Sequence, residues 1–125
     1  MNGPQAHWLP DGRRLHLNHG PIDLIVEAFG KRREIERAYA QAMACFGGLL
    51  AALVDELPAL RRPLGAAYPV LRGPVARRMA QATWPYRAVY MTPMAAVAGA
   101  VADEVLAAMV HGRTLDKGYV NDGGD

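Results

Sequence analysis

The sequence predicts an α+β fold, in which a mixed sheet is covered by about three helices. Three observations predict it. Apolar and polar residues alternate between residues 14 and 29, apolar residues recur every three to four positions from residue 31, and Gly and Pro separate the elements. The predicted order is β-β-α-α-β-α-β. With 125 residues, 51% of them hydrophobic, the chain can bury one core. We expect residues 1–13 to be a flexible lead-in and residues 14–125 to form a single domain.

The first predicted element is a hairpin in the stretch "RLHLNHGPIDLIVEAFG". Leu15 and Leu17 share one side of the first strand. After the Gly-Pro turn, the apolar side of the second strand carries Ile22, Leu24, Val26 and Ala28. Alternation with period two on both sides of a turn is typical of paired strands.

A long helix is predicted at about residues 31–57. Its apolar face comprises Ile35, Tyr39, Ala42, Met43, Phe46, Leu49, Leu50, Leu53 and Leu57. The pair Gly47-Gly48 interrupts it and costs about 2 kcal/mol relative to two alanines. The glycines therefore mark either a break in the helix or a place where another backbone packs closely. Pro58 and Pro63 end the element.

Two more helices and two strands complete the prediction. Pro74 is expected to start the second helix, which Pro85 stops, with core positions at Val75, Met79 and Ala82. Thr92 is expected to cap the third helix and Pro93 to start it, with Gly112 just beyond its end. The stretches "AVYM" and "GYVN" on either side of this helix are predicted strands. Together they suggest a βαβ crossover, which would make the two strands parallel.

The composition excludes several kinds of chemistry. The chain has no serine and one cysteine, Cys45, so a serine nucleophile and an internal disulfide are excluded, and no Cys/His pattern has zinc-site spacing. The first residues contain no apolar run, so we expect no secretory signal, and there is no GxGxxG or Walker-type motif. We expect a cytoplasmic protein that binds neither membrane nor nucleic acid. The basic clusters, among them Arg13-Arg14 and Lys31-Arg32-Arg33, are interpreted as solvated ends of elements, with anion or nucleic-acid binding as the alternative.

Two regions could carry a site. The third helix is almost bare of bulky side chains around Gly99, which allows a backbone or a ligand to approach, and one of Asp103 and Glu104 should point away from the core. The terminal "NDGGD" is either a hairpin turn or a ligand-binding loop. His16, His19 and Asp23 are interpreted as polar residues of an edge strand, with a metal or acid–base site as the alternative.

Three stretches taken together resemble a known family. "LHLNHGPIDLIVEAFG", "TPMAAVAGAVADEVLAAM" and "YVNDGGD" resemble, in that order, the UPF0280 family of uncharacterised proteins, from about Arg14 to the last residue. That family is related to the ApbE-like FAD:protein FMN transferases, which the last two stretches also resemble. The resemblance implies an incomplete ApbE-like fold, of which this chain is the N-terminal portion.

The resemblance also implies a set of site residues. Gly99 and Asp103 match the transferase helix pattern Gly-x-Ala-Lys-Gly-x-x-x-Asp, but Ala98 stands where that pattern has lysine. The Gly-Gly-Asp loop at the chain end matches the loop of the flavin site. The implied cofactor-binding residues are Thr92, Gly99, Asp103, Asn121, Gly123, Gly124 and Asp125. FAD or FMN is the implied cofactor, together with Mg²⁺, whose family ligands are missing here. We assign no catalytic residue and no metal ligand.

The expected function follows from this resemblance. The chain would bind a flavin or a nucleotide-like small molecule, in relation to FMN transfer from FAD, although this fragment alone would be inactive. The alternative is a non-catalytic binding or assembly module that keeps the fold without transferase activity. A half-fold would expose sheet edges, which leaves open a homo-oligomer formed through them.

Overall fold

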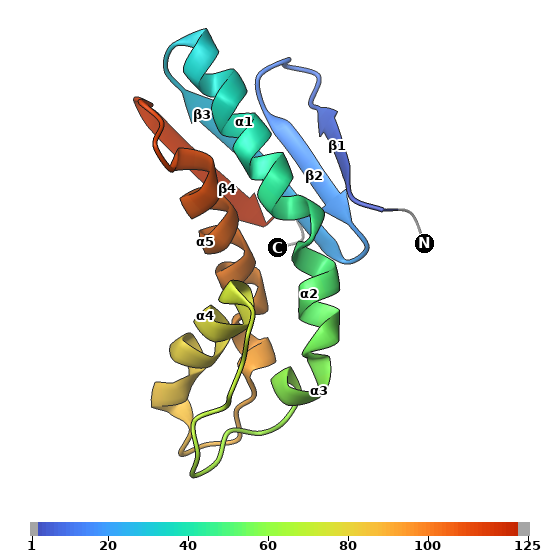
Figure 1. The fold of residues 1–125 in the computed structure, drawn as a ribbon, viewed down its shortest axis with the longest axis vertical. Coiled ribbons are helices and arrows are strands. Elements are labelled where there is room, and N and C mark those ends of the chain that lie inside the picture. The colour runs from blue at the N-terminus through green and yellow to red at the C-terminus, as the bar shows by residue number, and fades with distance from the viewer. Residues whose placement is uncertain (1–2, 123–125) are drawn as a thin grey trace. The chain divides into compact units, whose positions relative to one another are not determined.

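The computed structural model describes residues 3–122 and divides the chain into two compact units. The sheet unit comprises Met1–Leu50 and Ala102–Asp125, and the helical unit comprises Ala51–Val101. Figure 1 traces the chain through both units. Each unit is described below by itself.

The sheet unit contains a four-stranded antiparallel sheet in the order β1-β2-β3-β4 (Figure 1). The strands are β1 (Gln5–Trp8), β2 (Leu15–His19), β3 (Ile22–Phe29) and β4 (Lys117–Asp122). The α+β class and the hairpin of residues 14–29 are therefore confirmed. Strand β1 lies inside the stretch that we expected to be a loose lead-in.

One face of the sheet forms the core of the unit. Leu15 lies opposite Val26 and Leu17 opposite Leu24, and all four are almost fully buried. Helix α1 (Arg32–Gly47) covers this face with its own buried residues, Ala38, Tyr39, Ala42 and Phe46. Each large apolar side chain buried here stabilises the fold by about 1.5–3 kcal/mol relative to exposure. The alternating pattern of the sequence therefore predicted the core residues of these strands correctly.

The predicted parallel pairing is wrong. Strand β4 pairs with β3 in the antiparallel direction, with Val120 opposite Val26 and Tyr119 opposite Glu27. The stretch "AVYM" is not a strand, and Val89 and Tyr90 are exposed at 64% and 81%. A run of only four apolar residues is too short to predict whether the segment is a buried strand or an exposed loop.

The helical unit contains α3 (Leu57–Leu60), α4 (Pro74–Thr83) and the short 3₁₀ helices η1 (Trp84–Tyr86) and η2 (Pro93–Ala96). The chain passes between the two units within α2 (Leu49–Asp55) and α5 (Val97–Val110). The start of α4 at Pro74 is confirmed, and Val75 and Met79 are buried as predicted. Ala82 is exposed instead of facing the core, because the buried stripe continues from Met79 to Ala80 and Thr83.

The glycine pair in the long predicted helix marks a break. Helix α1 ends at Gly47 and α2 begins at Leu49. Among the described residues, no atom of another segment lies within 4 Å of a Cβ added at Gly47 or Gly48, so close packing of a described backbone does not explain the pair. The break agrees with the helix cost of two adjacent glycines.

Candidate functional site

The described residues of the expected flavin site are divided between the two units. Thr92 and Gly99 belong to the helical unit, whereas Asp103 and Asn121 belong to the sheet unit. Thr92 precedes η2, but its side chain makes no capping hydrogen bond, and its carbonyl accepts the N–H of Ala95 at 3.1 Å instead. Gly123, Gly124 and Asp125 lie outside the described residues.

Gly99 and Asp103 of α5 are both exposed. Gly99 is exposed, and a Cβ atom there would meet nothing within 4 Å among the described atoms. Asp103 is exposed as well, which confirms that one acidic residue of this helix points away from the core. Asn121 is a strand residue opposite Ile25 rather than part of a turn, because the β3–β4 ladder continues to Asp122.

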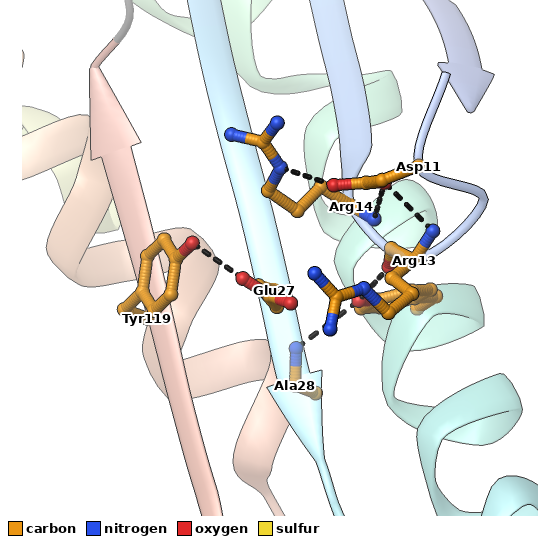
Figure 2. Close-up of polar contacts among 7 residues, drawn as sticks. Asp11, Arg13, Arg14, Glu27, Ala28 and Tyr119 are labelled. Atoms are coloured by element: carbon orange, nitrogen blue, oxygen red, sulfur yellow. Dashed lines mark hydrogen bonds and ion pairs between the residues drawn. The ribbon is translucent and has the colours of Figure 1, made fainter. Parts of the chain in front are cut away.

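The polar groups that the fold does bring together lie at one end of the sheet (Figure 2). Glu27 lies on β3 and is only 6% exposed. The Tyr119 hydroxyl on β4 donates a hydrogen bond of 2.6 Å to Glu27 Oε1. The pKa of Tyr119 is raised mainly by this hydrogen bond, because a nearby carboxylate favours the protonated hydroxyl. Burial of the hydroxyl is the second cause of the higher pKa. A buried carboxylate is thereby held by a donor from the neighbouring strand.

Tyr39 of α1 closes the end of the β2–β3 ladder. Its hydroxyl donates to the carbonyl of Arg13 at 2.7 Å and accepts the N–H of Ala28 at 3.1 Å. Extending the β2–β3 register would place Arg13 opposite Ala28, so the hydroxyl bridges the position where the next strand bond would form. Burial raises the pKa of Tyr39. The hydroxyl therefore fixes the backbone of residue 13 relative to both α1 and β3.

A charged turn supports the same end of the sheet. The Asp11 carboxylate accepts the backbone N–H groups of Arg13 and Arg14 at 2.8 and 3.0 Å and the Nε of Arg14 at 2.6 Å (Figure 2). The backbone bond from Arg14 is the largest of several causes that hold the pKa of Asp11 far below its ordinary value. Gly12, with a φ of +70°, adopts the left-handed conformation that this Asp-Gly turn requires.

A cavity of about 420 Å³ opens beside Tyr39 and this turn. We call it the Trp8 pocket. Its lining includes three aromatic residues, Trp8, Phe29 and Tyr39, and four charged residues, Arg13, Arg32, Glu27 and Glu36. Its volume lies in the range of small-molecule sites. Trp8 is 59% exposed, and its ring lies 5.6 Å from that of Tyr39 at 55°.

The pocket offers several groups that suit an anion. The Arg13 guanidinium makes no ion pair with any of residues 3–122. Arg32 pairs with Glu36 at 3.2 Å, but both side chains are exposed, and such a pair contributes little. Arg32 is also the first residue of α1. The N-cap residue of this helix, Lys31, makes no side-chain hydrogen bond to the N–H groups of the first turn. Helix N-termini of this kind attract anions.

Sequence reasoning missed this pocket. Its aromatic residues are far apart in the chain, and Trp8 fell in the presumed lead-in. One signal was available, because Asp11-Gly12 between two short runs is typical of a hairpin turn and would have indicated a strand before it. The anion-binding interpretation of the basic clusters already contained Arg13 and Arg32.

The remaining candidates are weaker. His16 Nε2 contacts Asp23 Oδ1 across the β2–β3 pair, but no group of three or more His, Cys, Asp or Glu within the described part of the chain could hold a metal ion. Cys45 is half-buried, and burial raises the pKa of its thiol, which disfavours a nucleophilic thiolate.

Within residues 3–122, two helical stretches are long and apolar enough to cross a membrane. They are Arg32–Asp55 and Pro93–Val110. Core helices of soluble proteins can be equally long and apolar.

Comparison with known proteins corrects the family expected from the sequence. The family model that matches is described as AbpE bacteria, and it covers residues 6–125. This is a different family from UPF0280 and the ApbE-like transferases, so neither relationship stands, and the inference of an N-terminal half loses its basis with them. No curated protein and no solved structure gives a match. Because the match spans nearly the whole sequence, the chain belongs to the AbpE bacteria family.

Proposed function

We propose that this chain is a binding module that takes a small planar anion, of the nucleotide or flavin mononucleotide class, in the Trp8 pocket. The observation that carries the proposal is the lining of one cavity by three aromatic rings and two arginines. Aromatic faces stack on flat heterocycles, and guanidinium groups bind phosphate through paired hydrogen bonds. No step of chemistry is proposed, since the described pocket holds no nucleophile paired with a base.

The local structure supports a pre-formed pocket. Tyr39 is locked through its hydroxyl, so its ring offers a fixed wall beside Trp8. The Asp11 turn and the Tyr39 hydroxyl fix the backbone that carries Arg13. Ordering these groups in advance lowers the entropic cost of binding.

The ligand class separates this proposal from transfer chemistry. A phosphate that binds beside Arg13, Arg32 and the start of α1 needs no metal ion. The proposal includes neither FMN transfer nor a role for Mg²⁺, because both expectations depended on the ApbE relationship.

The test is a titration of the whole chain with FMN and with AMP, followed by calorimetry, with inorganic phosphate as a third ligand. We expect FMN and AMP to bind and phosphate alone to bind much more weakly. Arg13→Gln and Trp8→Ala should each weaken binding by about tenfold or more, which corresponds to ~1.4 kcal/mol. Arg87→Gln, in the helical unit, is the matched control. The proposal fails if the unaltered chain binds neither ligand, or if both pocket variants bind as the control does.

Assembly through sheet edges remains a prediction. Strands β1 and β4 are the edges of the sheet, and β4 contributes six residues to its edge. Concentration-dependent elution in size-exclusion chromatography would test it.

A further inference from the structure

A second surface, in the helical unit, is independent of the Trp8 pocket. It is formed by the loop at residues 61–73 and by η1 with the loop that follows it, residues 84–92; we call it the two-loop surface. The N–H of Leu64 donates to the carbonyl of Met91 at 2.8 Å, and the rings of Tyr68 and Trp84 meet edge to face at 5.0 Å. These contacts hold the two loops side by side.

This surface exposes large apolar side chains at its loops. Val70 is 94% exposed, and Tyr86, Val89 and Tyr90 are all more than half exposed. Val70 also lines, with Arg62, a hollow of about 470 Å³. Single exposed apolar residues are ordinary, but several on two joined loops are typical of an interaction site.

The loops are anchored rather than loose. The buried Glu56 carboxylate accepts the N–H groups of Arg72 and Gly73 at 2.7 and 2.8 Å. Burial opposes its ionisation, but these two backbone bonds outweigh it and lower the pKa of Glu56. Arg87 lies over the Trp84 ring, with its guanidinium carbon 4.4 Å from the ring centre. The exposed side chains are therefore presented on a fixed backbone.

The charge of the unit indicates the chemistry of the partner. Residues 51–101 contain six arginines, no lysine, and two acidic residues, Asp55 and Glu56. Asp55 pairs with Arg72 at 2.6 Å, and Glu56 is used by the backbone. Arg61, Arg62 and Arg87 make no ion pair with another described residue. The partner that fits this surface is anionic and also accepts aliphatic side chains.

We propose that the two-loop surface docks on an anionic lipid membrane. Exposed valines gain free energy by entering the acyl boundary, tyrosines favour the interface, and arginines meet the lipid phosphates. Single-stranded nucleic acid fits less well, because valines do not stack on bases and Arg87 already covers Trp84. A membrane partner was not expected from the sequence, because α4 separates the two loops in the chain.

The experiment is co-sedimentation of the whole chain with vesicles of equal parts phosphatidylglycerol and phosphatidylcholine, and with pure phosphatidylcholine vesicles. We expect binding to the anionic vesicles, weakened by salt. The double variant Val70→Asp/Val89→Asp should lose at least tenfold in binding. Arg62→Gln and Arg87→Gln should each lose about fivefold, and only on the anionic vesicles. Val54→Asp, at an exposed valine of α2, is the matched control and should bind normally.

Circular dichroism of each variant establishes that the fold is retained. Equal sedimentation of all variants, or no sedimentation of the unaltered chain, would overturn the proposal. Binding of a single-stranded oligonucleotide without binding of vesicles would overturn it in favour of a nucleic-acid partner.

Discussion

The Tyr119 hydroxyl and the Glu27 carboxylate form a 2.6 Å hydrogen bond between two directly opposed residues of β4 and β3. Directly opposed side chains on adjacent strands are the pairs that most affect sheet stability. Here the pair satisfies a carboxylate that is 6% exposed, and an unpaired charge at that position would be costly. The bond therefore ties the C-terminal strand to the N-terminal hairpin.

Tyr119→Phe should lower the free energy of unfolding by about 1–2 kcal/mol, because it leaves the Glu27 carboxylate without its donor. Urea denaturation measures the loss. Tyr90→Phe, at a tyrosine that is 81% exposed, is the control and should change stability very little. Equal stability of the two variants would show that the Tyr119 bond contributes nothing.

Tyr39→Phe should be at least as damaging. The ring stays, but the buried N–H of Ala28 and the carbonyl of Arg13 both lose their partner. The expected cost is about 1–3 kcal/mol, again against the Tyr90→Phe control. Hydrogen exchange at the amide of residue 28 gives a local readout. It should accelerate in Tyr39→Phe, and unchanged protection there would contradict the bridging role.

The Asp11 turn predicts a specific acid dependence. Because its folded pKa lies below the ordinary value of 3.8, ionised Asp11 stabilises the fold above that value, and the contribution is lost as the pH falls through the folded pKa. An NMR titration of the carboxylate should give a midpoint below the ordinary value of 3.8. Asp11→Asn should remove the corresponding part of the acid dependence of unfolding. An Asp11 carboxylate that titrates at its ordinary value would contradict the geometry of this turn.

Replacement of Gly30 and of Gly99 by alanine should change the stability of the fold in opposite directions. Gly30 has a φ of +151°, and an added Cβ would lie 3.4 Å from the backbone of residues 115 and 116, so Gly30→Ala should destabilise by about 1–3 kcal/mol. Gly99 sits in open space in α5, so Gly99→Ala should stabilise by about 0.5–1 kcal/mol. Thermal melts of both variants check the signs. A destabilising Gly99→Ala would restore the idea that something packs against this glycine.

The hairpin was predictable because its pattern is local and strong. The buried positions of the two strands follow a period of two, at Leu15, Leu17, Leu24 and Val26. Over that length, such a period indicates strands rather than a helix. The start of α4 was equally predictable, since Pro74 suits the first helical position. Both predictions needed only neighbouring residues.

The strand pairing and the pocket bring together residues that are far apart in the sequence. Local patterns therefore could not predict them. The sequence offered a crossover for the last strand, but the pairing of Tyr119 with Glu27 joins positions 92 residues apart. Likewise, the Trp8 pocket assembles residues from β1, the following turn, β3 and α1. Glu27 also escaped notice, because an acidic residue in an alternating strand is normally exposed to solvent.

The most direct test of the binding proposal uses the two tryptophans of the chain, Trp8 and Trp84. Trp84→Phe leaves Trp8 as the only tryptophan, whereas Trp8→Phe leaves Trp84 in the helical unit. We predict that AMP changes the tryptophan fluorescence of the Trp84→Phe variant with a saturable dependence on ligand concentration, and that it leaves the Trp8→Phe variant unchanged. An unchanged signal from Trp84→Phe, with calorimetry showing that AMP still binds, would place the ligand elsewhere and contradict the account.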